Sequence, residues 1–165
     1  MNKKIADLMA AMIAYDQGDV RRIQHFIKVH NLAATIGTLE NMPAEELFIL
    51  EAAAILHDIG IHKSEEKYQS SAGKYQEIEG PGEAEKLLCN LGGFSNSQIN
   101  RIKYLIAHHH TYTEIQGLDY QILVEADFLV NLYEDNSPMS AVQNVLKKIF
   151  RTKSGINLLT SMFNA

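Results

Sequence analysis

The stretch AILHDIGIHK, residues 54–63, ends an apolar run with an imidazole and a carboxylate, those of His57 and Asp58. The run has the character of a buried helix, and Gly60 follows the pair, where a helix commonly ends. A histidine and an ionised aspartate are costly to bury unless a partner satisfies them. The pair therefore either closes a structural hydrogen bond or holds a cation.

Helical spacing dominates the rest of the chain. Apolar residues recur every three or four positions, and no segment alternates with a period of two for long enough to indicate a sheet. The pattern predicts an all-α fold with helices over residues 2–15, 19–39, 43–58, 83–91, 95–110, 118–135, 138–150 and 154–163. We expect the polar stretch 62–82 to be a long loop with at most a short helical turn, and loops of this length are often functional lids.

The composition is that of a globular protein with one domain. The 165 residues suit a single core, 46% of them are hydrophobic, and the formal net charge is -5. This charge argues against a large nucleic-acid-binding surface, and no apolar run reaches the roughly 18 residues that a membrane span needs. The single cysteine, Cys89, excludes an intramolecular disulfide and is interpreted as a small buried side chain. We expect one domain over residues 1–165, located in the cytoplasm.

Four residues from three predicted helices are candidate metal ligands. His25 lies on the apolar side of its helix, His57 and Asp58 end the next one, and Asp127 interrupts the apolar stretch LVEADFLV. Two imidazoles and two carboxylates suit a divalent transition metal, whether Fe, Mn, Co, Ni or Zn, and helical bundles build such sites from inward-facing side chains. Each residue taken alone also has a structural interpretation, which for Asp127 is a buried acid that caps a helix or pairs with Arg or His.

Three motifs together resemble the HD-domain metal-dependent phosphohydrolases, whose pattern is H…HD…D on an all-helical core. They are RRIQHFIKVHNLA at 21–33, AILHDIG at 54–60 and ILVEADFLV at 122–130. The first family motif resembles H-x-x-x-V-x-x-x-A, which selects His25 rather than His30 as the first ligand. The resemblance implies an HD-domain helical bundle with its motifs between about residues 19 and 135, flanked by terminal helices at 2–15 and 138–163.

The resemblance implies hydrolysis of a phosphate ester or anhydride in a small phosphorylated metabolite, most often a nucleotide. A metal ion held by His25, His57, Asp58 and Asp127 would lower the pKa of a bound water and polarise a phosphoryl oxygen. Asp58 could also orient the attacking water. His109 follows the I-x-x spacing of the family and is the candidate for a second-metal ligand or a phosphate contact.

Other polar residues near the motifs are candidates for substrate binding. Arg22 lies one helical turn before His25 and could grip a phosphate with two hydrogen bonds, although a surface salt bridge explains it equally well. The remaining candidates, which could also be solvent-facing residues, are His62, Lys63, His108, His110 and Glu79.

The chain departs from the family pattern at two places. Ile61 stands where many relatives have Lys directly after the HD-[IL]-G stretch, and the segment KYQEIEGPG lacks the histidine of binuclear members. Glu77 or Glu79 could replace that histidine as an oxygen ligand. The pattern therefore favours one tightly held metal ion and leaves a second possible.

Three functions are compatible with these features. The first is a metal-dependent phosphohydrolase, which we favour because the ligand set is complete. The second is a catalytically weak HD module that binds a nucleotide or a metal and acts as a sensor through a partner. The third is a helical bundle whose His/Asp cluster is only a polar core network. The apolar terminal helices also make a homodimer plausible.

Overall fold

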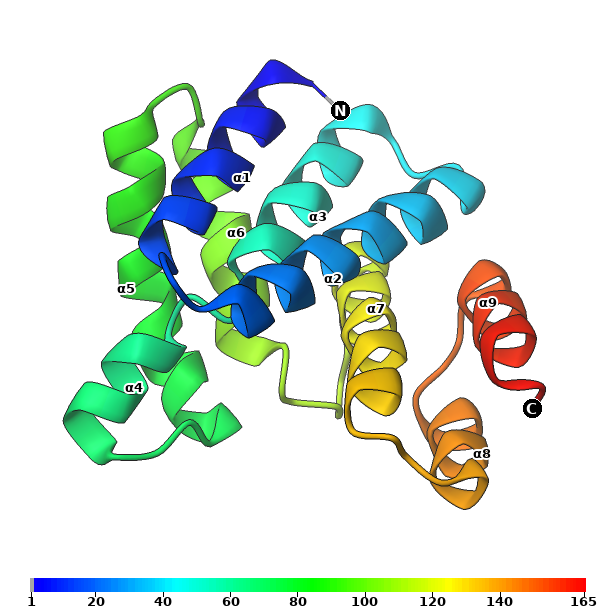
Figure 1. The fold of residues 1–165 in the computed structure, drawn as a ribbon. Helices are drawn as coiled ribbons and strands as arrows, with labels where there is room; N and C mark the ends of the chain where they lie inside the picture. The colour runs from blue at the N-terminus through cyan, green and yellow to red at the C-terminus, as the bar shows by residue number, and fades with distance from the viewer. Residues whose placement is uncertain (1) are drawn as a thin grey trace.

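The computed structural model describes residues 2–165, and over this range the chain forms nine helices and no strand (Figure 1). The helices are α1 Lys3–Tyr15, α2 Val20–Leu39, α3 Ala44–Leu56, α4 Ile61–Tyr68, α5 Gly73–Leu91, α6 Asn96–His108, α7 Leu118–Glu134, α8 Met139–Lys148 and α9 Lys153–Phe163. Side chains cap several of them; for example, Asp19 accepts a hydrogen bond from the backbone N–H of Arg22 at the start of α2. The predicted all-α helical bundle is confirmed.

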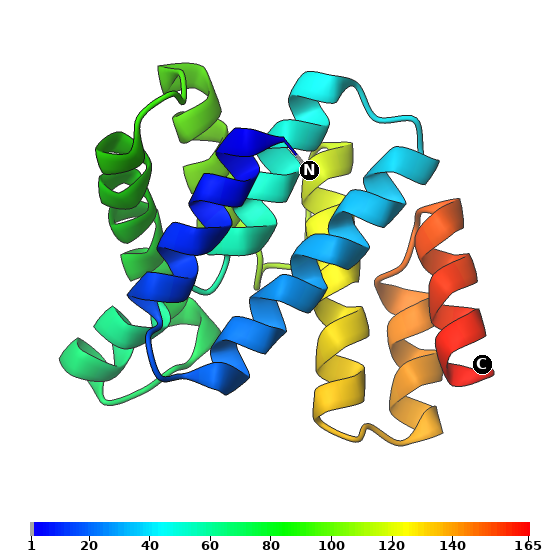
Figure 2. The ribbon, with the colours of Figure 1, turned by 45° about the horizontal axis from the view of Figure 1, so that its top comes forward.

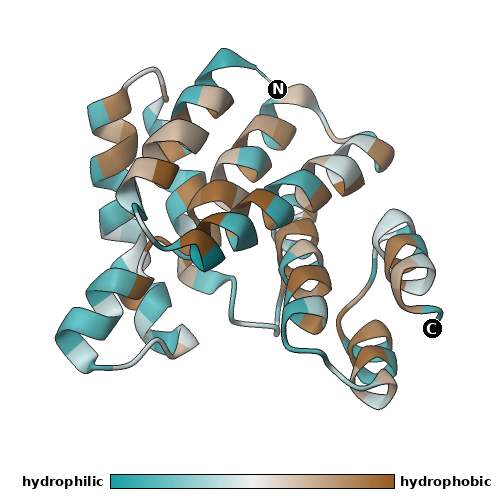
Figure 3. Cartoon of the chain, viewed as in Figure 1, coloured by the Kyte–Doolittle hydropathy of each residue, from teal (hydrophilic) through white to brown (hydrophobic). Residues whose placement is uncertain are grey.

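Helices α3 and α7 form the centre of the bundle. All residues of α3 from Ala52 to Leu56 are buried, and so are those of α7 from Ile122 to Asp127. A helix that is apolar on every side is covered on every side. Figure 3 shows the contrast with α4, which is mostly hydrophilic. Within the described residues, no helix is both long enough and apolar enough to cross a membrane.

The packing of α2 brings the motifs together. Helix α2 packs against both α3 and α7, while α5 packs against α6 and α4. Helices α8 and α9 lie beside α7 at the opposite side of the bundle from α4 and α5 (Figures 1 and 2). The apolar side of α2, the end of α3 and the middle of α7 therefore meet in the interior.

The prediction of a long loop over residues 62–82 is wrong. Helix α4 occupies its first part, a short connection over residues 69–72 follows, and α5 begins at Gly73. Helix α5 continues through Pro81, although a proline lacks the N–H that would bond the carbonyl four residues earlier. Tertiary packing compensates, because Gly80 lies against the backbone of Gly60.

The interpretation of Cys89 as a buried residue is also wrong. Leu88 is fully buried, whereas the thiol of Cys89 is exposed. Neighbouring residues of a helix point about 100° apart. Cys89 therefore lies on the outer side of α5.

The close contact of Gly60 with α5 generates a prediction on stability. A Cβ at position 60 would lie 2.7 Å from the backbone nitrogen of Gly80 and 2.8 Å from the carbonyl oxygen of Gln76. We expect Gly60→Ala to lower the free energy of unfolding by about 1–3 kcal/mol, because backbone atoms must move to admit the methyl group.

Urea denaturation measures this change, and Gly82→Ala is the matched control. A Cβ at Gly82 meets nothing within 4 Å. The control should therefore be neutral or stabilising by up to about 1 kcal/mol, since alanine is the better helix former. Equal unfolding free energies for the two variants would contradict the steric account.

Candidate metal centre

Helix ends and helix interiors position the polar side chains of the centre. His57 and His109 directly follow the last residues of α3 and α6, where the backbone carbonyls of the last turn are free to bond their imidazoles. Asp58 lies in the turn before α4, His25 on the buried face of α2 and Asp127 in the middle of α7. His57 and His109 are fully buried, and His25 and Asp127 are nearly so.

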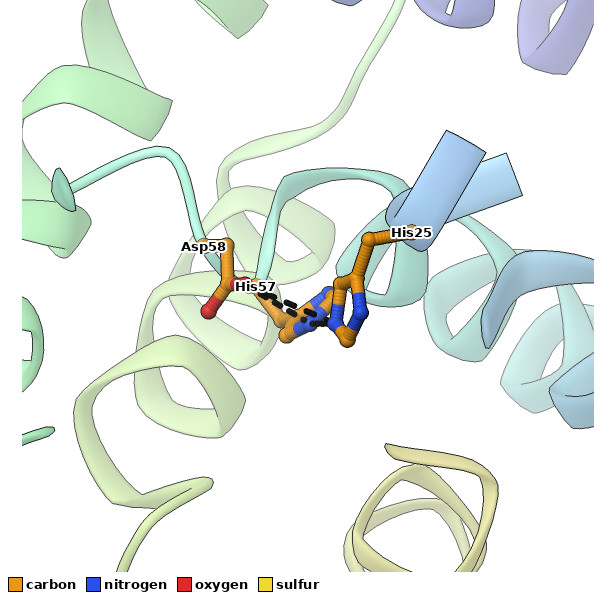
Figure 4. Close-up of side chains that lie close together, drawn as sticks. All are labelled: His25, His57 and Asp58. Atoms are coloured by element: carbon orange, nitrogen blue, oxygen red, sulfur yellow. Dashed lines mark hydrogen bonds and ion pairs between the residues drawn. The ribbon is translucent and has the colours of Figure 1, made fainter. Parts of the chain in front are cut away.

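The structure brings His25, His57, Asp58 and Asp127 together, and we call these four residues the first ligand group. Nε2 of His25 lies 3.2 Å from Nε2 of His57, 3.5 Å from Oδ2 of Asp58 and 3.2 Å from Oδ1 of Asp127. Nε2 of His57 lies 3.5 Å from Oδ2 of Asp58 and 3.6 Å from Oδ1 of Asp127. Figure 4 shows the imidazoles of His25 and His57 facing one another beside the Asp58 carboxylate.

The hydrogen bonds of the two imidazoles determine which nitrogen is free. Nδ1 of His57 donates to the carbonyl oxygen of Ala54 across 2.8 Å, and Nδ1 of His25 donates to a carboxylate oxygen of Glu134 across 2.9 Å. Each neutral ring therefore carries its hydrogen on Nδ1 and presents a lone pair at Nε2. These lone pairs face the carboxylates of Asp58 and Asp127, and such a set of acceptors needs either a shared proton or a metal cation.

The spacing within the first ligand group fits a metal ion. Ligand atoms at about 2.1 Å from an ion lie about 3.0–3.4 Å apart when they are separated by octahedral or tetrahedral angles. The distances from Nε2 of His25 and from Nε2 of His57 to the other ligand atoms are 3.2–3.6 Å, which is within about 0.2 Å of this range. The nitrogen and oxygen donors suit a divalent transition metal.

A second buried acid on α7, Glu125, is a carboxylate with a structural role, because backbone donors satisfy it. Glu125 is fully buried and accepts hydrogen bonds from the backbone N–H groups of Arg151 and Thr152, at 2.7 and 2.9 Å. These two backbone groups lie just before α9, and the side-chain amide of Gln121 on α7 also donates to Glu125. Asp127, two positions later, instead faces the imidazole nitrogens of His25 and His57, and the amide of Asn131 donates to it across 2.9 Å. Asp127 therefore caps no helix, and its position against two imidazoles fits both the pairing with histidine and the metal-site interpretation.

A second ligand group consists of Asp58, His109 and His110, whose ligand atoms lie within 4.8 Å of one another. Nε2 of His109 lies 3.5 Å from Oδ1 of Asp58, and Nδ1 of His109 donates to the carbonyl of Ile106. Within residues 2–165, Nε2 of His109 is the one buried side-chain nitrogen or oxygen without a hydrogen-bond partner. Asp58 thus turns one oxygen toward each ligand group, and the second group could hold another ion.

The electrostatics of the centre follow from burial and mutual proximity. Burial lowers the pKa of His57, but the carboxylates of Asp58 and Asp127 outweigh it and raise that pKa to about 9. Burial raises the pKa of both carboxyl groups, yet the nearby imidazoles hold the pKa of each well below its usual range. Burial and the neighbouring His109 lower the pKa of His110 to about 4. His110 is therefore neutral near pH 7, as a ligand must be.

A cleft of about 520 Å³ opens onto the first ligand group. Its volume lies within the range of small-molecule sites. Nearly all of the residues that line it are polar. They come from α2 and the residue before it, from the segment between Asp58 and the start of α5, and from α5 and α7. The lining residues are Asp19, Arg21, Arg22, His25, Asp58, Ile61, Ser71, Gln76, Asn131 and Glu134.

Arg22 and His62 form a network at the mouth of this cleft. The guanidinium of Arg22 contacts Glu65 at 2.6 Å and Asp19 at 3.3 Å. His62 donates from Nε2 to Asp16 across 2.7 Å, so its Nδ1 accepts from Arg22 across 3.2 Å. Both nitrogens of His62 are engaged, and its contact with Arg22 orients the guanidinium.

Three other substrate-binding candidates lie outside the two ligand groups. Lys63 pairs with Glu66 at the surface. The ring of His108 stacks on the ring of Tyr104, and its Nδ1 donates a hydrogen bond to the backbone carbonyl oxygen of Tyr104. Glu79 accepts hydrogen bonds from Lys67 and Tyr68, at 2.9 and 2.8 Å.

Glu77, the other acid considered as an oxygen ligand, is likewise outside both groups. It accepts hydrogen bonds from the backbone N–H of His110, at 3.1 Å, and from the hydroxyl of Thr111. Glu77 thus holds the segment that carries His110.

Sequence reasoning missed three residues that border the centre: Gln76, Asn131 and Glu134. Oε1 of Gln76 lies 3.1 Å from Nε2 of His110. Asn131 and Glu134 follow Asp127 at four- and seven-residue spacing, which places all three on one side of α7. That polar stripe on an otherwise apolar helix was the available signal.

Removal of a ligand should remove the metal ion while leaving the fold. We expect His57→Ala and Asp127→Ala each to lose the tightly bound metal and to keep a helical circular dichroism spectrum, because the core around α3 and α7 remains. Elemental analysis of the purified proteins measures the metal. Full metal content in both variants would refute the first ligand group.

Metal binding should expel protons near neutral pH. The metal-free His57 is protonated below its pKa of about 9, whereas a ligand must be neutral. Protons therefore compete with the metal, and the affinity should rise from about pH 6 to about pH 9 and then level off. Calorimetric titration in buffers of different ionisation enthalpy counts the protons released, and an affinity independent of pH over this interval would be inconsistent with the structure.

The family model of the HD domain matches the chain over residues 22–149. The match includes every residue of both ligand groups. No curated protein and no solved structure matches the sequence. The matched region is most of the 165 residues, and the chain belongs to the HD domain family.

Proposed function

We propose that this protein is a metal-dependent phosphohydrolase that cleaves a phosphate ester or anhydride of a small metabolite, with nucleotides as the first class to test. The observation that carries the proposal is the first ligand group, in which four acceptor atoms converge at the edge of an open polar cleft. Membership in a family of generally metal-dependent hydrolases supports it.

The proposed roles follow from the geometry. When bound, a divalent ion lowers the pKa of a water molecule and polarises a phosphoryl oxygen. His25, His57, Asp58 and Asp127 would hold that ion. Asp58, with one oxygen toward each ligand group, would also orient an attacking water. His109 presents an unpartnered lone pair beside Asp58, which can hold a second ion or accept a proton.

The cleft supports a small phosphorylated substrate. Its volume of about 520 Å³ admits a molecule the size of a mononucleotide. Arg21 and Arg22 stand on its rim and would attract the phosphate, and the amides of Gln76 and Asn131 can bond hydroxyl groups. No nucleic acid or membrane surface is part of the proposal.

Turnover by the metal-loaded protein tests the proposal. The protein is incubated with a pool of nucleotides and other phosphorylated metabolites, and products are identified by mass spectrometry. Asp58→Ala serves as the blank. Loss of a substrate with the wild type alone would establish the activity. Stoichiometric metal without turnover would contradict it and favour a module that binds a nucleotide without hydrolysing it.

Arg22 provides a prediction on substrate affinity. Arg22→Met should raise KM by about 10-fold or more with a smaller effect on kcat, because a charge-assisted contact to the substrate phosphate is worth about 1.5–3 kcal/mol. Lys63→Met is the control, since Lys63 pairs with Glu66 at the surface. Steady-state kinetics on the identified substrate measures both, and an unchanged KM in Arg22→Met would remove Arg22 from the binding site.

A further inference from the structure

Glu134, the last residue of α7, links the first ligand group to a lysine on α2. Its Oε2 accepts a hydrogen bond from Nδ1 of His25 across 2.9 Å, and its Oε1 lies 2.6 Å from Nζ of Lys28. The side chain of Glu134 is 15% exposed and borders the cleft. The ammonium of Lys28 also lies over the ring of Tyr133. Lys28 and Glu134 therefore form a continuous polar connection to the metal-facing imidazole.

The three buried histidines of the centre differ in how their Nδ1 atoms are held. His57 and His109 donate to carbonyl oxygens three residues earlier in their own helical segments, those of Ala54 and Ile106. Helix geometry supplies both acceptors. His25 lies inside α2, where backbone carbonyls are taken by the helix, and its acceptor comes from a side chain on another helix. The orientation of His25 therefore depends on Glu134.

We propose that Glu134 is a positioning residue that orients His25 for metal binding and that Lys28 holds its carboxylate in place. The inference rests on the proposed function, because it takes the first ligand group to be a metal site. An ionised carboxylate can only accept, so it fixes the hydrogen of His25 on Nδ1 and leaves Nε2 free for the ion. A carboxylate partner also makes the imidazole a stronger ligand.

The competing interpretation is that Glu134 only ties α7 to α2 through Lys28. The chain offers a matched pair that separates the two interpretations. His30, five residues after His25 on the same helix, is buried and contacts Glu51 of α3 at 3.0 Å. The His30–Glu51 pair has the same chemistry and ties two helices together, but neither residue belongs to a ligand group. Loss of Glu51 therefore reports the cost of a helix-tying pair alone.

The experiment measures Co²⁺ binding to the full chain after chelator treatment, by competition with a chelating dye. Glu134→Ala should weaken the affinity by roughly 10–100-fold. Glu134→Gln keeps an oxygen acceptor without the charge and should fall between the wild type and Glu134→Ala. Lys28→Met should have a smaller effect of the same sign. Glu51→Ala should bind Co²⁺ with the affinity of the wild type, although its free energy of unfolding in urea should be lower.

The visible absorption spectrum of bound Co²⁺ gives a second readout, because it responds to the ligand field rather than to stability. We expect the spectrum to change in Glu134→Ala and to be unchanged in Glu51→Ala. Wild-type affinity and spectrum in both Glu134 variants would overturn the positioning role. Equal losses in Glu134→Ala and Glu51→Ala would also overturn it and leave helix tying as the explanation. If the wild type itself binds no Co²⁺, the proposed metal-dependent function fails as well.

Discussion

The convergence of acceptor atoms on one point is the constraint on which the centre depends. Nδ1 of His25 and Nδ1 of His57 each donate a hydrogen bond to an oxygen outside the ligand group. The two Nε2 lone pairs therefore face each other across 3.2 Å, beside the carboxylate oxygens of Asp58 and Asp127. Without a cation, such an arrangement needs an extra proton, and the raised pKa of His57 reflects this demand. A bound metal ion satisfies the same atoms and replaces the water that they lose on burial.

The fold supplies this arrangement by simple means. The ends of α3 and α6 aim His57 and His109 into the interior, and each helix satisfies the second nitrogen of its own histidine. The apolar character of α7 buries Asp127 among residues that offer it few donors. The tight contact of Gly60 with Gly80 holds the turn containing Asp58 against α5. Each polar group is thus fixed by an element whose stability comes from apolar packing.

The main features of the centre could be predicted from sequence because ionisable residues are unexpected in apolar helical segments. His57, Asp58 and Asp127 are polar residues in apolar helical segments, and the family motif connected them with His25. Gln76 was not found, because Gln is common near helix ends and only the packing of helices gives it a role, and the polar stripe that includes Glu134 was not connected with the centre. The helices over residues 61–82 were missed because this stretch is polar and has little helical periodicity, and the contact of Gly80 with Gly60 that supports α5 cannot be seen in the local sequence.

The central claim is that the first ligand group holds a metal ion, and anomalous X-ray scattering from crystals grown with Zn²⁺ tests it most directly. The account predicts an anomalous peak at about 2.0–2.2 Å from Nε2 of His25 and of His57, with oxygens of Asp58 and Asp127 in the same coordination sphere. A structure in which these four side chains keep their hydrogen bonds to one another and the anomalous signal lies elsewhere would contradict it.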